Sequence, residues 1–195
     1  MWEKVAKYLG KNSKYKSFEG RWLDFPIHIA FKLRHWHLIH QLRDRKIREY
    51  IRQIKYSTDN KKAIQNLENL IEDNYGFMLF QAIEKAKIEL SSLENSHILF
   101  KEQNLLIKEA IDRKEFEQII ADKVGKIKGC VNEVLAKAHL AEKDIDTVFI
   151  TGGSSHIPCI RRIFSEKFGI EKMRQMDAFT SVAYGLGISA SMDFE

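Results

Sequence analysis

Apolar residues recur every three to four positions along most of the chain, which is the spacing of one face of an α-helix. This pattern predicts helices over residues 2–9, 27–54, 62–91, 113–139, 157–168 and 179–191. We expect residues 27–54 to form one long helix or two in sequence, and Gly76 to bend the helix over residues 62–91. Gly10 ends the first helix, and the polar residues 11–20 after it are expected to form a loop. Thr180 or Asp177 can cap the last helix.

The period changes to that of β-structure at three places. Residues 96–101 and 105–111 are β-rich runs separated by a short polar link, which predicts a hairpin. Residues 147–150 form a third apolar, β-branched run. Three clear strands are too few for an independent sheet, so we expect strands outside this chain to complete it. The order of elements predicts an α/β or mixed α+β fold with more helix than strand.

Residues 146–158 (DTVFITGGSSHIP) join the third strand to a helix through two adjacent glycines. Gly152 and Gly153 allow positive φ and carry no side chain, so amide groups and the N-terminus of the helix opened by Pro158 can approach a ligand closely. Phosphate and ribose are the usual ligands of such a turn. On these residues alone, an ordinary tight turn is the alternative.

The same turn does not match the common catalytic motifs. Ser154 and Ser155 follow the glycines directly, without the Gly-x-Ser-x-Gly spacing of a nucleophile elbow, so a hydrolase is not expected. The Walker phosphate loop and the GxGxxG dinucleotide fingerprint are also absent. Nucleotide contact through backbone amides and polar groups on helices is the function that remains.

The charge of the chain is uneven. The net charge is +5 over 195 residues, and the excess comes mostly from the first 65 residues. A solvated helix face explains such a region, and an acidic partner or nucleic acid is the alternative. Basic and aromatic residues do not interleave as in a single-strand platform, so we do not expect nucleic-acid binding.

The cysteine and histidine positions indicate neither a disulfide nor a metal site. Cys130 and Cys159 are far apart and lack CxxC spacing, which predicts two buried thiols and a cytoplasmic location. His35, His37 and His40 lack a metal-binding signature and are expected to be partly exposed helix residues. No N-terminal leader and no apolar run long enough to span a bilayer is present, so a secreted or membrane protein is not expected.

Four segments, in chain order, resemble the second lobe of the ATPase domain of the 70-kDa heat-shock protein family. They are residues 82–92 (AIEKAKIELSS), 111–119 (IDRKEFEQI), 148–164 (VFITGGSSHIPCIRRIF) and 177–190 (DAFTSVAYGLGISA). Residues 10–40 are similar to the divergent YegD-type members of that family. The resemblance implies an α/β, actin-like ATPase fold (ribonuclease H-like), in which ATP or ADP with Mg lies between two lobes.

The resemblance also implies a division of this chain, which would be a helix-rich second lobe with an incomplete sheet. Residues 1–120 would form its outer helix and hairpin subdomain (IIB-like). Residues 121–195 would form its inner α/β subdomain (IIA-like). The partner that the resemblance implies is a missing N-terminal ATPase lobe, with chaperone or client proteins as further partners.

In the outer subdomain, the resemblance assigns nucleotide contacts to four residues of one helix. Glu84, Lys87 and Ser91 would reach the ribose and adenine, and their spacing places them on one helix face. Ile88 would pack on the adenine, at a position where many members of the family stack a cation.

In the inner subdomain, the resemblance assigns the glycine turn to the nucleotide. Gly152, Gly153 and Ser154 would approach the phosphates and ribose, and His156 would lie along the adenine. The usual residue at His156 is Arg, which carries a permanent charge. Phe179 also stands where the family has an acidic residue.

No catalytic residue and no metal ligand is assigned in this chain. The family's phosphate turn, catalytic lysine and magnesium-binding aspartates belong to the first lobe, and no motif here matches them. We therefore expect a fragment that supplies part of an ATP/ADP site and is inactive alone. The alternative is a non-catalytic protein-interaction module that retains the lobe and uses its basic helices as the contact surface.

Overall fold

The computed structural model describes residues 1–175 and 180–192, so the predicted Asp177 cap and Phe179 lie outside the described residues. The chain forms two compact units, Met1–Phe116 and Glu117–Glu195. This division lies near the predicted boundary after residue 120. The assignment of the two units to family subdomains stays a prediction.

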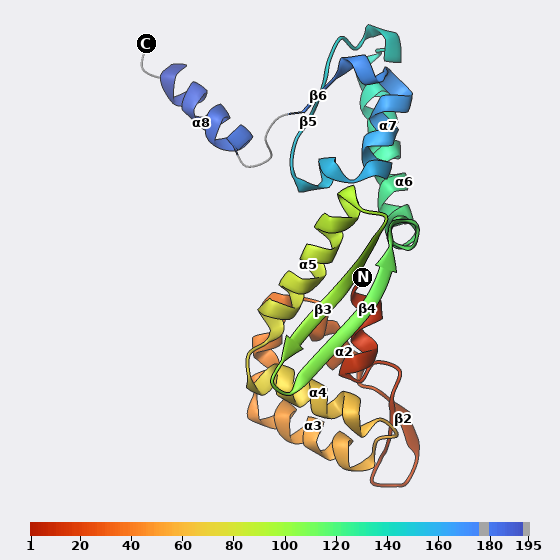
Figure 1. The fold of residues 1–195 in the computed structure, drawn as a ribbon, viewed down its shortest axis with the longest axis vertical. Coiled ribbons are helices and arrows are strands. Elements are labelled where there is room, and N and C mark those ends of the chain that lie inside the picture. The colour runs from red at the N-terminus through yellow and green to blue at the C-terminus, as the bar shows by residue number, and fades with distance from the viewer. Residues whose placement is uncertain (176–179, 193–195) are drawn as a thin grey trace. The chain divides into compact units, whose positions relative to one another are not determined.

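The first unit is helical, with two hairpins (Figure 1). Its elements in chain order are α1 (Trp2–Ala6), η1 (Lys7–Leu9), β1 (Lys14–Lys16), β2 (Trp22–Asp24), α2 (Ile27–Leu33), η2 (Trp36–Arg43), α3 (Arg45–Ser57), α4 (Lys61–Glu72), α5 (Gly76–Ser92), β3 (Asn95–Glu102) and β4 (Leu105–Asp112). η1 and η2 are 3₁₀ helices. α6 (Arg113–Ala138) begins in this unit and continues into the second.

The predicted hairpin over residues 96–111 is confirmed and forms one side of the core. β3 and β4 pair antiparallel, with Phe100 opposite Ile107. Their side chains alternate between buried and exposed, as expected for a hairpin with one covered face. α5 lies along β3, and its Leu79 and Leu90 are fully buried. The hairpin therefore fixes which face of α5 packs inward, and Figure 1 shows α5 beside β3.

The prediction of one or two helices over residues 27–54 is wrong, because this region forms three elements. His35 adopts an extended conformation with φ −123°, which separates α2 from η2. Asp44 then caps α3, since its carboxylate accepts hydrogen bonds from the N–H groups of Lys46 at 2.9 Å and Ile47 at 3.4 Å. Asp44 therefore marks the start of α3, a helix start that the sequence analysis did not predict.

The predicted helix over residues 62–91 is also interrupted. Asn74 has φ 59°, a left-handed conformation that asparagine tolerates, and it ends the turn after α4. Gly76 starts α5 and does not bend a continuous helix. A Cβ at Gly76 would lie 2.8 Å from Cδ1 of Ile39, so η2 and α5 approach closely at this point.

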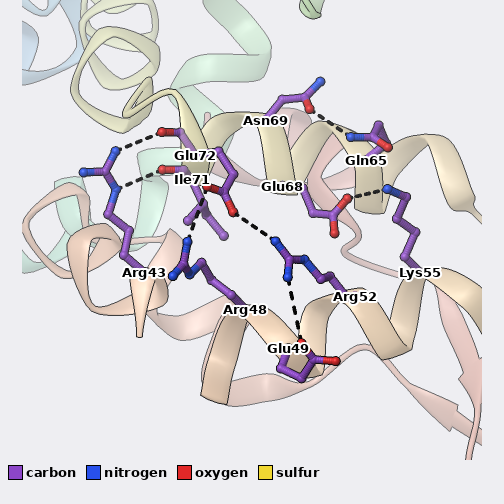
Figure 2. Close-up of polar contacts among 10 residues, drawn as sticks. All are labelled: Arg43, Arg48, Glu49, Arg52, Lys55, Gln65, Glu68, Asn69, Ile71 and Glu72. Atoms are coloured by element: carbon purple, nitrogen blue, oxygen red, sulfur yellow. Dashed lines mark hydrogen bonds and ion pairs between the residues drawn. The ribbon is translucent and has the colours of Figure 1, made fainter. Parts of the chain in front are cut away.

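The basic helix α3 is joined to the acidic side of α4 by the ion pairs in Figure 2. Lys55 pairs with Glu68 at 2.6 Å, and Arg48 and Arg52 both approach Glu72. Arg43, the last residue of η2, donates to the carbonyl oxygens of residues 71 and 72 at 3.0 and 3.1 Å. These carbonyls lie in the last turn of α4, where the hydrogen bonds of the helix end, so Arg43 acts as a C-terminal cap.

The predicted loop over residues 11–20 contains strand β1, which pairs antiparallel with β2. The loop begins at Gly10, which ends η1 with φ +94°. A Cβ at this position would lie 2.6 Å from Cδ1 of Ile64 and 2.7 Å from Cε2 of Phe25. Gly10 therefore meets both the steric and the conformational requirements for glycine.

The second unit contains the glycine turn between a strand and a helix. Its elements after α6 are η3 (Glu142–Asp144), β5 (Val148–Ile150), η4 (Gly153–His156), α7 (Pro158–Phe168), η5 (Ile170–Lys172), β6 (Met173–Gln175) and α8 (Thr180–Met192). β5 and β6 pair in parallel, so α7 is part of the crossover between them. Ile150, Ile160 and Ile163 are buried in this unit.

Two further predictions need correction. The described residues form six strands in three two-stranded sheets, instead of three strands, because the short β1, β2 and β6 lack a long apolar run. Cys130 is exposed on α6 and Cys159 is partly exposed, so neither cysteine is fully buried as predicted. In the part of the chain that is described, no helix is long and apolar enough to cross a membrane.

Candidate functional site

The predicted contact residues of α5 lie on the face of the helix turned away from the core. Good helix formers fill residues 82–90 (AIEKAKIEL), and the apolar positions Ile83, Ala86 and Leu90 are buried. Glu84 and Ile88 are exposed, while Lys87 and Ser91 are partly exposed. The helix therefore presents all four predicted residues where a ligand could reach them.

Glu84 and Lys87 form an ion pair one helical turn apart. The two side chains keep 58% and 36% of their surface exposed, so water screens the pair and it contributes at most about 1 kcal/mol. A ligand with hydroxyl groups can replace these contacts at little cost. The pair therefore provides a carboxylate acceptor and an ammonium donor side by side.

Ile88 adds an apolar surface beside this pair. Its side chain is 65% exposed, and an exposed aliphatic side chain is suited to packing against a flat aromatic ring. Ser91, one turn further along, adds a hydroxyl group on the same face.

The glycine turn in the second unit leaves open space around its backbone. Gly152 has φ 86°, as expected, whereas Gly153 keeps an ordinary φ and starts η4. A Cβ added at either glycine would meet no atom within 4 Å. The open space means that packing within the unit does not explain the second glycine, and that a ligand would have room to approach the backbone there.

The serines of the turn have different surroundings. Ser155 is buried, and its hydroxyl donates to the carbonyl oxygen of Gly152 at 2.7 Å. Ser154 is exposed. Ser155 therefore holds the turn in shape, and Ser154 is free to face solvent or a ligand.

The strand does not pass directly into a helix, as the sequence suggested. η4 lies between Gly152 and α7, and the N–H of Ile157 donates to Ser154 at 3.2 Å. α7 starts at Pro158, as predicted, because proline fits the first helical position, where no N–H partner is needed.

His156 is held by a residue that the sequence analysis missed. The side-chain Nε2 of Gln175, at the end of β6, lies 3.2 Å from Nδ1 of His156. Oε1 of Gln175 accepts from Nη1 of Arg161 at 2.5 Å. Gln175 could not be found from the pattern, because β6 has only three residues and was not predicted.

A hollow of about 280 Å³ lies beside the turn within the second unit. Its lining is largely apolar and consists of Ile127, Phe149, Ile150, Thr151, Ser154, Ser155, Ile160, Arg161 and Phe164. This volume is near the low end for small-molecule sites, which fits a partial binding surface.

Thiol and metal chemistry gain no support at this turn. Burial raises the pKa of Cys159, the second residue of α7, and the carboxylate of Glu117 raises it further, so the thiol stays protonated at neutral pH. In the described ranges 1–175 and 180–192, no group of three His, Cys, Asp or Glu side chains could hold a metal ion. We therefore assign no magnesium ligand here.

The structure thus brings the predicted residues together in two groups, one in each unit. Glu84, Lys87, Ile88 and Ser91 share a face of α5, and Gly152, Gly153, Ser154 and His156 share the turn. That the two groups meet at one nucleotide stays a prediction.

Comparison with known proteins identifies the family. The sequence matches the family described as Hsp70 protein over residues 41–193. It is 30% identical to the chaperone protein DnaK of Deinococcus deserti over 161 residues, which cover 78% of this chain and 24% of that protein. It is 28% identical to the DnaK of Cyanidioschyzon merolae, over 71% of this chain and 24% of the relative. With the DnaK of Thermotoga maritima the identity is 31%, over 58% of this chain and 20% of the relative.

The chain spans about a quarter of the length of the first two of these relatives. The family match covers well over half of the chain and includes α5, the glycine turn and α7. The chain therefore belongs to the Hsp70 family.

Proposed function

We propose that this chain forms the second lobe of an actin-like ATPase domain and supplies part of an ATP/ADP site. The observation that carries the proposal is the open glycine turn, where Gly152 and Gly153 leave free space next to exposed backbone. Members of the Hsp70 family share this actin-like fold by the resemblance described above. The protein is proposed to be cytoplasmic and close to the YegD type.

Each group of residues has a defined part in the proposal. On α5, the carboxylate of Glu84 accepts from ribose hydroxyls, Lys87 donates, and Ile88 packs on the adenine. At the turn, the backbone of Gly152 and Gly153 approaches the phosphates, and the imidazole of His156 lies along the base.

The residues fit the nucleotide and not its magnesium ion. Phosphoryl transfer needs a metal ion and charged groups that contact the phosphates. Among the described residues there is no cluster of carboxylates that could hold a metal ion, and the turn contains no lysine. We therefore propose that this chain binds nucleotide weakly and hydrolyses it only with a first lobe. The first lobe would be its partner.

Calorimetric titration with ATP and with ADP tests the proposal. Gly153→Asp is expected to abolish binding, because it adds a carboxylate where the phosphates would lie. Gly129→Asp is the matched control, since this glycine is also exposed in the second unit and has no neighbour within 4 Å. Equal affinity in wild type and Gly153→Asp would contradict the placement of the phosphates.

The absence of heat at millimolar nucleotide would instead favour the non-catalytic interaction module. A phosphate-release assay adds a second arm, for which we expect no turnover by the chain alone. Turnover at the rate of a complete ATPase would contradict the assignment of the catalytic groups to another lobe.

A further inference from the structure

A groove in the first unit lies between the β1–β2 hairpin and the C-terminal part of α3. Its volume is about 490 Å³, within the range of sites that bind small ligands or single side chains of a partner. It is lined by Tyr15, Lys16, Ser17, Phe18, Leu23, Tyr50, Gln53, Ile54, Tyr56 and Ser57. None of these residues belongs to the proposed nucleotide site.

The wall formed by the hairpin is fixed by contacts to the end of α3. Tyr15 forms a β-bridge with Thr58. The hydroxyl of Ser57 donates to the carbonyl oxygen of Lys16 at 3.0 Å. The N–H of Asp59 donates to the carbonyl oxygen of Lys14 at 2.9 Å. The groove is therefore formed before any partner arrives, which lowers the entropy lost on binding.

The floor of the groove combines aromatic rings with one aliphatic residue. Tyr15 and Tyr50 share a hydrogen bond of 2.5 Å between their hydroxyl oxygens, and their rings meet edge to face. Ile54, which is 1% exposed, also lines the groove. One hydroxyl group donates to the other, and the rest of the lining is mostly apolar, so the floor accepts apolar groups.

The rim exposes large apolar side chains. Phe18 is fully exposed at the hairpin tip, Tyr56 is 85% exposed and Leu23 is 43% exposed. Isolated apolar residues on a surface are common, but here they border one apolar groove. Such aromatic side chains provide most of the binding energy in many protein interfaces.

The groove lies in a basic part of the chain. The two segments that form it, residues 14–24 and α3, contain eight Lys and Arg and three Asp and Glu, a net charge of +5. Lys16 lines the groove, with its ammonium 5.2 Å from the ring centre of Trp22, and no carboxylate is among the lining residues. The field at the groove therefore attracts an acidic partner.

We infer that this groove docks an acidic peptide segment of a partner protein, which inserts one aromatic or aliphatic side chain between Phe18 and Tyr56. A peptide fits better than a nucleic acid, because the mostly apolar lining suits one inserted side chain, whereas a nucleic acid binds chiefly through its charged phosphates. The inference does not depend on nucleotide binding.

Fluorescence anisotropy with the full chain tests the inference. The probes are short fluorescein-labelled peptides rich in Asp and Glu, each with one central Phe, Leu or Trp. We expect saturable binding of at least one probe, and about a tenfold loss when its central residue is Ala. Failure of all three probes to saturate by about 1 mM overturns the inference.

Surface variants then place the binding in the groove. Phe18→Ala and Tyr56→Ala should each weaken binding about tenfold, and both positions are exposed enough to leave folding intact. Phe77→Ala, which removes an exposed aromatic ring of α5, is the control and should bind normally. Lys16→Glu should also weaken binding, whereas Lys126→Glu on α6 should not.

Two outcomes in this comparison overturn the inference. One is equal binding by the groove variants and their controls. The other is tighter binding of oligo-dT than of the peptides, lost in the same groove variants, which would identify a nucleic-acid site.

Discussion

The side-chain amide of Gln175 lies 3.2 Å from Nδ1 of His156, so the last residue of β6 holds the imidazole at the end of the glycine turn. If His156 lies along the adenine, loss of this contact leaves the ring free to rotate. We expect Gln175→Ala to weaken ADP binding by about 1 kcal/mol, or roughly fivefold. Calorimetry measures this change, with Gln118→Ala, an exposed glutamine of α6, as control. Unchanged affinity would contradict the placement of His156 along the adenine base.

Lys87 allows a test that separates binding from stability. Its ion pair with Glu84 is solvent-exposed, so Lys87→Ala is expected to change the free energy of unfolding by less than about 1 kcal/mol. Nucleotide affinity should nevertheless fall, because the variant lacks the ammonium donor. Urea unfolding and calorimetry on the same sample measure both quantities. Lys85→Ala changes an exposed neighbour on α5 and should leave both quantities unchanged. An equal loss of nucleotide affinity in Lys85→Ala would contradict the prediction that the nucleotide contacts the Lys87 face of the helix.

Tyr50 should ionise well above the ordinary pKa of a tyrosine. Burial and the hydrogen bond with Tyr15 raise the pKa of Tyr50 from 10.0 to about 12. The pKa of Tyr50 is higher in the folded chain than in the unfolded chain. The contribution of protonated Tyr50 to the stability of the fold is therefore complete below pH 10 and is lost as the pH rises toward about 12. Ultraviolet titration of tyrosinate should show this late step, and Tyr50→Phe should remove it. Tyr56→Phe, at a position that is 85% exposed, is the control and should leave the late step in place.

Glu109 on β4 should make the first unit sensitive to acid. Burial raises the pKa of Glu109, but hydrogen bonds from Lys7 and Tyr8 outweigh burial and leave the pKa below 4.5. Because the folded pKa is depressed, the stabilisation is present above pH 4.5 and is lost as the pH falls through the lowered pKa. We expect Glu109→Gln to cost about 1–2 kcal/mol at neutral pH and less in acid.

Urea unfolding at neutral pH and below pH 4.5 measures this difference. Glu19→Gln is the control, because Glu19 is exposed and pairs only loosely with Arg21, at 3.5 Å. A Glu109→Gln penalty that stays constant in acid would contradict the role of the ionised carboxylate.

The long and strongly patterned elements could be predicted from the sequence. The hairpin β3–β4 alternates apolar and polar residues over its length, and α7 begins at a proline after a glycine turn. In these places local preference and tertiary packing favour the same structure. The four candidate residues of α5 could also be placed on one face from their spacing alone.

Short elements and interruptions could not be predicted in the same way. β6 has three residues and depends on pairing with β5, which is distant in sequence. The left-handed Asn74 and the extended His35 break apolar patterns that continue through them. Gln175 was therefore missed as a neighbour of His156, because its position follows from the parallel pairing and not from its own sequence context.

Gly10 limits how this region can change during evolution. Any other amino acid there would need a left-handed backbone and would collide with both Ile64 and Phe25. The backbone at residue 10, the side chain of Ile64 and the side chain of Phe25 would then all have to change together. A single substitution changes only one of them. We expect a deep mutational scan to tolerate almost nothing at position 10, while Gly20, with φ +76° and no atom within 4 Å, accepts asparagine. As the N-terminal region changes in sequence, the glycine that ends the first helix should thus stay the same.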